Sequence, residues 1–112
     1  MKLNNTQIEQ VDRQIKRLLK SESYYGEKYK SLGIDGIKSQ EDFLKLPFSD
    51  KNDLRNAYPL GIMACDESEI VRIHSSSGTT GQPVIIPYTA KDVDDWATMF
   101  ARCYEMAGIT KN

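Results

Sequence analysis

Hydrophobic residues near the start of the chain follow a helical spacing. They are Ile8, Val11, Ile15, Leu18 and Leu19. Residues three and four positions apart share one side of a helix, so this pattern predicts an amphipathic helix whose apolar face needs a partner surface. Thr6, followed three residues later by Glu9, matches a capping box. Thr6 is therefore predicted to cap the first helix.

Three shorter helices are predicted to follow. The first lies within residues 21–34, where Gly33 suits its C-terminal end. Ser39 and Ser49 can each cap a further short helix, because a serine hydroxyl accepts hydrogen bonds from the free N–H groups of a first turn. Residues 1–60 are thus predicted to form a helical lead-in.

The pattern becomes β-type after this lead-in. The segments EIVRIH, residues 69–74, and PVIIPY, residues 83–88, are rich in β-branched residues. Such runs, bounded by turn-forming residues, are typical of strands. A hairpin with a long connecting loop is therefore predicted.

A long amphipathic helix is predicted directly after the second strand. Thr89 and Asp92 match a capping box, and Gly108 suits the C-terminal cap. One wide apolar face lies between these ends, formed by Val93, Trp96, Ala97, Phe100, Tyr104 and Ala107. Packing against other elements is the favoured role for its aromatic residues, over lining a pocket for an aromatic acid.

The predicted fold class is α/β, with α+β character within residues 1–112. A single hairpin and one aromatic-faced helix, residues 69–108, do not close a core. We therefore expect the chain to be the N-terminal segment of a larger domain. Open strand edges and an uncovered apolar face also predict that the segment self-associates.

The charge balance excludes several classes of partner. Fifteen basic and sixteen acidic residues give a formal net charge of -1. This balance gives no electrostatic signature for nucleic acid or an anionic membrane, so neither is expected as a partner. The mixed charges of KNDLR, residues 51–55, are predicted to form a solvated face.

The cysteines indicate a reducing compartment. Cys65 and Cys103 are far apart and show no CxxC spacing, and the chain contains one His. These features argue against a structural zinc site and favour reduced thiols in a cytoplasmic protein. Neither cysteine is expected to have a partner that activates its thiol.

The stretch HSSSGTTGQP, residues 74–83, contains the loop between the two strands and carries the candidate chemistry. Hairpin loops usually contain two to five residues, and this longer loop consists largely of Ser, Thr and Gly. Gly78 and Gly81 can adopt positive φ, which would let N–H and hydroxyl groups converge on an anion. It is not a Walker A loop, because Gln82 and Pro83 follow Gly81 and a strand comes next. From these residues alone, a phosphate-binding loop and a plain connection both remain open.

For the neighbouring His74, a structural role at the strand end is favoured over a ligand contact.

The loop resembles a known family. SSSGTTGQP is similar to the phosphate loop of acyl-adenylate-forming enzymes. LKLPFSDKNDLRNAYPLG, residues 44–61, and DVDDWATMFARCYEMAG, residues 92–108, resemble the flanks of this loop in the phenylacetate–coenzyme A ligases. The similarity begins at about Tyr24 and continues to the end of the chain. Many relatives carry Lys at the position of Gln82.

The resemblance implies a reaction and a set of binding residues. A carboxylic acid, aryl and phenylacetate-like, would react with ATP to give an acyl-adenylate, which is then transferred to coenzyme A with Mg²⁺ as cofactor. The residues implied to bind the ATP phosphates are Ser76, Ser77, Gly78, Thr79, Thr80 and Gly81. The family's catalytic residues and magnesium ligand would lie beyond Asn112. No metal site is expected here, and the 112-residue chain alone is expected to be inactive.

Two alternatives remain open. The parent protein could adenylate a different acid or a cofactor and use another acceptor. The chain could instead be a non-catalytic module that binds nucleotide phosphates, or only a protein partner. Sequence downstream of Asn112 would separate the enzymes from the module.

Overall fold

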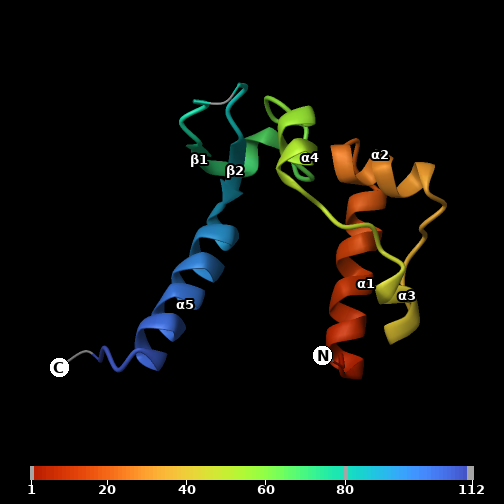
Figure 1. The fold of residues 1–112 in the computed structure, drawn as a ribbon, viewed down its shortest axis with the longest axis horizontal. Coiled ribbons are helices and arrows are strands. Elements are labelled where there is room, and N and C mark those ends of the chain that lie inside the picture. The colour runs from red at the N-terminus through yellow and green to blue at the C-terminus, as the bar shows by residue number, and fades with distance from the viewer. Residues whose placement is uncertain (1, 80, 111–112) are drawn as a thin grey trace.

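The chain forms helices over its first half and a strand–loop–strand–helix unit over its second. The computed structural model describes residues 2–79 and 81–110. Its elements are α1 (Asn5–Leu19), α2 (Tyr24–Ser31), α3 (Gln40–Leu44), α4 (Lys51–Asn56), the 3₁₀ turn η1 (Glu67–Glu69), β1 (Ile70–Ser75), β2 (Ile85–Thr89) and α5 (Ala90–Met106). Figure 1 shows α1 to α3 grouped together, α4 between them and the hairpin, and α5 extending away. The predicted α+β character is confirmed for the described residues.

The predicted cap of α1 is wrong by two residues. Asn4 caps the helix: its side-chain oxygen accepts from the N–H of Gln7 at 2.9 Å, and the Gln7 side chain accepts from the N–H of Asn4 at 2.9 Å. Asn is as good a cap as Thr, and the earlier start adds residues to the helix. Thr6 therefore lies within α1.

The cap of α4 also differs from the prediction. Asp50, rather than Ser49, accepts hydrogen bonds from the N–H groups of Asn52 at 2.7 Å and Asp53 at 3.1 Å. A single carboxylate oxygen, Asp50 Oδ1, accepts from both donors. The carboxylate also carries the negative charge that a helix N-terminus favours.

The other predicted helix ends are confirmed. Ser39 accepts from a first-turn N–H of α3 at 3.1 Å, and Thr89 forms a reciprocal capping box with Asp92 at α5. Gly33 and Gly108 lie directly after the C-caps of α2 and α5, and their N–H groups bond back to the last turns. These local signals decide where the helices end.

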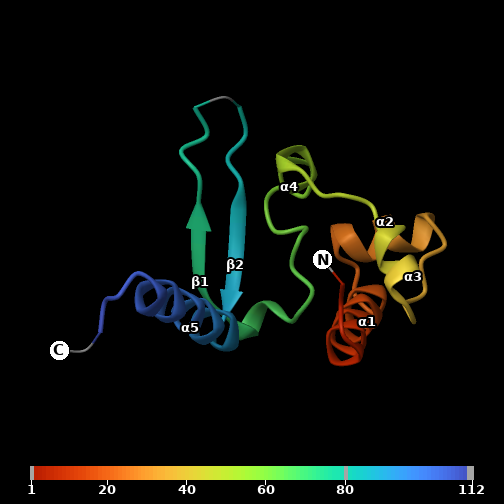
Figure 2. The same ribbon diagram turned by 60° about the horizontal axis from the view of Figure 1, so that its bottom comes forward.

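The strands form an antiparallel two-stranded sheet. Ser75 lies opposite Ile85 and Ile73 lies opposite Pro87, with an irregularity in β1 between Ile70 and Arg72. α5 follows β2 directly and packs against the hairpin near the end distant from the loop. The sheet therefore holds the loop at one end and α5 at the other (Figure 2).

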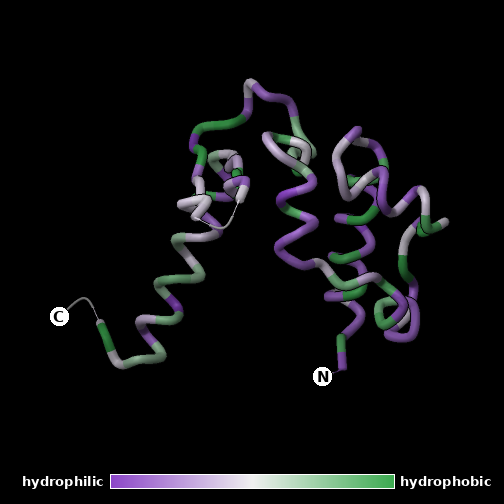
Figure 3. The backbone as a smooth tube through the Cα atoms, turned by 45° about the horizontal axis from the view of Figure 1, so that its top comes forward, coloured by the Kyte–Doolittle hydropathy of each residue, from purple (hydrophilic) through white to green (hydrophobic). Residues whose placement is uncertain are grey.

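The buried apolar core is small. Ile15, Ile37 and Ala57 are buried among the helices, and Val84 is buried beside the loop, each with at most 6% of its surface exposed. Large apolar side chains of the second half remain more exposed, including Trp96 at 40%, Phe100 at 47% and Tyr104 at 53%. Figure 3 shows hydrophobic residues recurring along α5 where it extends from the rest of the chain. No helix in the described part combines the length and apolar composition needed to cross a bilayer.

Candidate functional site

Ser76 anchors the base of the predicted phosphate loop. Its N–H donates to the carbonyl oxygen of Val84 at 2.9 Å, and its side-chain oxygen accepts from the N–H of Val84 at 2.9 Å. The hydroxyl oxygen thus replaces the backbone carbonyl that would normally complete a pair of strand hydrogen bonds. Ser76 and Val84 thus add one residue pair to the hairpin, and the loop begins after Ser76.

The two loop glycines adopt the predicted positive φ. Gly78 has φ 66° and Gly81 has φ 129°, and the N–H of Gly81 donates to the carbonyl oxygen of Gly78 at 3.1 Å. A Cβ added at Gly78 would lie 3.1 Å from the Gly81 oxygen and 3.4 Å from the nitrogen of Pro83, whereas one added at Gly81 meets nothing within 4 Å. Gly78 therefore allows the backbone to fold tightly on itself, and the space beside Gly81 is open to a ligand.

The remaining loop donors lie at its exposed tip. The N–H groups of Ser76 and Gly81 are already bonded within the loop. Ser77 and Thr79 are exposed and carry hydroxyl groups, and neither side chain bonds to another described residue. Thr80, the sixth predicted phosphate-binding residue, lies outside the described residues. The donors that the described loop offers to an anion thus include the hydroxyl groups of Ser77 and Thr79.

His74 belongs to an aromatic cluster rather than to the loop. Its ring centroid lies 4.9 Å from that of Tyr88 and 5.3 Å from that of Trp96, and the Tyr88 and Trp96 rings stack at 6.1 Å. Such contacts stabilise the packing of α5 on the hairpin. The favoured structural role of His74 is supported.

The aromatic face of α5 is only partly used in packing. Trp96 reaches the sheet, whereas Phe100 contacts the Trp96 ring at a centroid distance of 5.3 Å and Tyr104 lies further along the helix. Together with Arg72 they line an open groove of about 350 Å³. Core packing, the favoured role of these residues, is thus observed for Trp96 but leaves Phe100 and Tyr104 half exposed.

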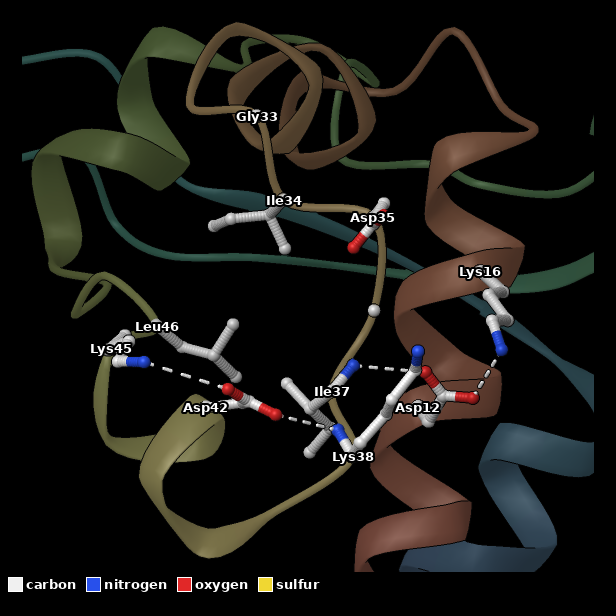
Figure 4. Close-up of a pocket in the computed structure, with 11 residues that line it drawn as sticks. Asp12, Lys16, Gly33, Ile34, Asp35, Ile37, Lys38, Asp42, Lys45 and Leu46 are labelled. Atoms are coloured by element: carbon white, nitrogen blue, oxygen red, sulfur yellow. Dashed lines mark hydrogen bonds and ion pairs between the residues drawn. The ribbon is translucent and has the colours of Figure 1, made fainter.

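A second cavity, of about 530 Å³, lies between α1, α3 and the segment 33–38 (Figure 4). Asp12 accepts from Lys16 Nζ at 2.6 Å and from the N–H of Ile37 at 3.0 Å, and these bonds hold its pKa below the usual value. Asp42 accepts from the N–H of Lys38 at 3.0 Å, and this bond lowers its pKa. Both carboxylates therefore anchor the segment 33–38 and α3 to their neighbours.

A polar cluster that the sequence did not reveal joins α2 to α4. Asp53 accepts from Lys28 Nζ at 2.7 Å and from the Tyr24 hydroxyl at 2.8 Å. These bonds, that to Lys28 first, lower the pKa of Asp53 to about 2. The Asp53 side chain is 13% exposed, so the prediction that the KNDLR charges form a solvated face is wrong at this residue. Helical spacing places Tyr24 and Lys28 together, but nothing local indicates a partner so far along the chain.

The surroundings of Cys65 do not activate its thiol. Burial, followed by the nearby carboxylate of Glu69, raises the pKa of the Cys65 thiol, and Cys103 is exposed. A raised pKa disfavours the reactive thiolate. Within residues 2–79 and 81–110, no three His, Cys, Asp or Glu side chains form a group that could hold a metal ion.

Comparison with known proteins identifies relatives of the chain. No protein-family model matches it. It is 38% identical over 111 residues to the phenylacetate–coenzyme A ligase of Pseudomonas putida, covering 97% of this chain and 25% of that protein. It is 37% identical over 108 residues to the ligase of the same name from Aromatoleum evansii, covering 95% of this chain and 24% of the relative. The Thermus thermophilus ligase of this name is 36% identical over 109 residues.

These similarities place the chain among the relatives of acid–coenzyme A ligases. Within that class, the resemblance to the phenylacetate–coenzyme A ligases is confirmed. It covers at least 95% of the chain and so includes α1, ahead of the predicted starting point near Tyr24. The chain spans about a quarter of the length of the curated relatives it matches.

Proposed function

We propose that this chain supplies the ATP-phosphate-binding loop of an acyl–coenzyme A ligase that activates a phenylacetate-like aryl acid. The observation that carries this proposal is the loop between β1 and β2. It combines two glycines at positive φ with exposed donors at its tip, in a chain related to phenylacetate–coenzyme A ligases. We place the ligase in the cytoplasm, where ATP and coenzyme A are available.

The reaction requires stabilisation of phosphate charge. A carboxylate oxygen of the acid attacks the α-phosphorus of ATP, and the bond to the β-phosphate breaks to release pyrophosphate. The thiol of coenzyme A then attacks the acyl carbon, AMP leaves with the bonding electron pair, and the thiol proton is lost to a base. Negative charge grows on the departing pyrophosphate in the first step, where positioned donors lower the barrier. Mg²⁺ would supply countercharge through ligands outside the residues described here.

The residues of this chain divide into anchors and donors. Ser76 is a positioning residue, because its hydroxyl oxygen fixes the loop base through the N–H of Val84. Gly78 allows the tight turn, and the open space at Gly81 allows a phosphate to approach. Ser77 and Thr79 supply the hydroxyl and N–H donors. We include Thr80 among the donors on the strength of the resemblance.

A chimeric ligase tests the proposal. This chain would replace the matching quarter of the Pseudomonas putida relative, and phenylacetate-dependent ATP–pyrophosphate exchange would be measured. We expect exchange in the chimera and none in the isolated 112-residue chain. A panel of other carboxylic acids would then show whether an aryl acid is preferred.

The matched controls change one loop donor at a time. Thr79→Val removes a hydroxyl while keeping side-chain shape, and Thr98→Val makes the same change on exposed α5. A folded chimera in which both variants exchange pyrophosphate at the parental rate would contradict a phosphate role for the Thr79 hydroxyl. A folded chimera without any exchange would favour the non-catalytic alternatives.

A further inference from the structure

One face of the hairpin connects α5 to the base of the loop. Alternate residues of a strand share a face, so His74 and Ser76 lie on the same side of β1 and its continuation. His74 lies opposite Ile86, and the next pair on this face is Ser76 with Val84 at the loop base. α5 reaches the same face through Trp96, whose ring centroid lies 5.3 Å from that of His74. His74 therefore contacts α5 and lies one residue pair away from the loop base.

Three rings hold β1, β2 and α5 together at this point. The ring centroid of His74 lies 4.9 Å from that of Tyr88 in β2, and the Tyr88 and Trp96 centroids are 6.1 Å apart. Each of the three elements thus contributes one ring that contacts the other two. The sequence of β1, IVRIHS, contains no aromatic side chain besides His74. Without His74, β1 contributes no ring to the cluster.

The loop base depends on how firmly β1 is held. A two-stranded hairpin alone is marginally stable, so its geometry depends on what packs against its face. α5 packs at the end distant from the loop (Figure 2), and His74 extends this contact toward the loop. Ser76 then holds the loop base through its two hydrogen bonds to Val84, each of 2.9 Å. A shift of β1 at His74 would move Ser76 and the loop residues that follow it.

We propose that His74 is a positioning residue for the loop. Its ring holds β1 against β2 and α5, and the strand carries this constraint over two residues to Ser76. His74 acts through packing on Tyr88 and Trp96, and its imidazole donates no hydrogen bond to a phosphate. The effect on catalysis rests on the proposed role in ATP binding, because donors lower a barrier only when they are already positioned. The link between His74 and the loop base does not rest on that role.

Three variants separate positioning from the other possible roles of His74. His74→Ala removes the ring and both of its contacts. His74→Phe keeps an aromatic ring and removes the ring N–H groups, so it should restore a packing role but not a hydrogen bond to a ligand. Phe100→Ala is the matched control, because Phe100 contacts the Trp96 ring at 5.3 Å but no hairpin ring among the described residues.

Hydrogen exchange measures the positioning of the loop base without requiring activity. In the chimeric ligase, mass spectrometry would follow a peptide that contains Ser76 and Val84, whose N–H groups are both hydrogen-bonded. Loss of two ring contacts should make exchange of these N–H groups roughly five- to hundredfold faster in His74→Ala. We expect near-parental exchange in His74→Phe and Phe100→Ala. Parental exchange in His74→Ala, or equally fast exchange in His74→Phe and His74→Ala, would overturn the proposal.

Activity of the same chimeras tests the consequence for adenylation. His74→Ala should slow phenylacetate-dependent pyrophosphate exchange roughly ten- to hundredfold, because small displacements of positioned groups are costly. Thioester formation from preformed acyl-adenylate should be spared, and His74→Phe should recover most of the exchange. If His74→Ala does not fold, His74→Leu, which keeps apolar bulk without the ring, takes its place in both measurements.

The two measurements distinguish failure of this inference from failure of the proposed function. A folded parent chimera without pyrophosphate exchange contradicts the proposed function, and hydrogen exchange then decides the positioning role of His74. An active parent chimera whose His74→Ala variant adenylates at the parental rate overturns the positioning role and leaves the proposed function intact.

Discussion

Replacing Ser76 by alanine should separate anchoring of the loop from contact with phosphate. The change removes the oxygen that accepts from the N–H of Val84 at 2.9 Å, while Val84 itself is 6% exposed. A partly buried N–H that loses its acceptor costs about 1–2 kcal/mol of unfolding free energy. For a domain near this size, that lowers the melting temperature by roughly 4–8 °C.

Thermal unfolding of the isolated chain, followed by circular dichroism, measures this loss. Ser77→Ala is the matched control, because the Ser77 side chain bonds to no other described residue and should change stability little. Ser76→Thr keeps an oxygen at the same position and should recover most of the lost stability. The anchoring argument fails if Ser76→Ala lowers the melting temperature by less than about 1 °C, or by no more than Ser77→Ala does.

Three further predictions follow from the described contacts. In the chimeric ligase, Thr79→Val should slow adenylation roughly ten- to hundredfold, for a loss of about 1.5–3 kcal/mol, and spare thioester formation from preformed acyl-adenylate; single-turnover measurement of each half-reaction checks this. Asp53→Asn should lower the free energy of unfolding at neutral pH, and the gap between variant and parent should shrink as pH falls from about 4 toward 2, because the pKa of Asp53 is lowered to about 2 in the folded state. Unfolding midpoints of both proteins across this pH range check this. Gly26→Ala should cost roughly 1–3 kcal/mol, because the added Cβ would lie 2.8 Å from the backbone oxygen of Ser21, whereas exposed Glu27→Ala should cost little; urea unfolding compares them.

Local signals in the sequence predicted most helix ends. Ser39 and the Thr89–Asp92 pair act as caps because each satisfies N–H groups within the same turn, so no distant residue is needed. The start of α1 was mispredicted because NNTQIEQ contains two overlapping cap patterns, and the one at Asn4 forms. Near this end, the N–H of Leu3 donates to the Gln40 side chain of α3 at 2.8 Å, a tertiary contact that spacing along the chain does not reveal.

The candidate site was predictable in kind but not in detail. The run of Ser, Thr and Gly indicated a loop with positive φ, and Gly78 and Gly81 confirm it. The sequence could not predict which loop groups form hydrogen bonds within the hairpin, because the bonds of Ser76 to Val84 depend on strand register. The Lys28–Asp53 ion pair was missed for a similar reason, since its partners are 25 positions apart and meet only when α2 and α4 pack.

The position of the proposed phosphate loop depends on the packing of the hairpin. A two-stranded sheet alone is marginally stable, and here one face is held by the His74–Tyr88–Trp96 cluster while Val71 and Ile73 remain exposed. A loop lowers a reaction barrier only when its donors are already positioned. Ser76 transmits the geometry of the strands to the loop base through its two bonds to Val84.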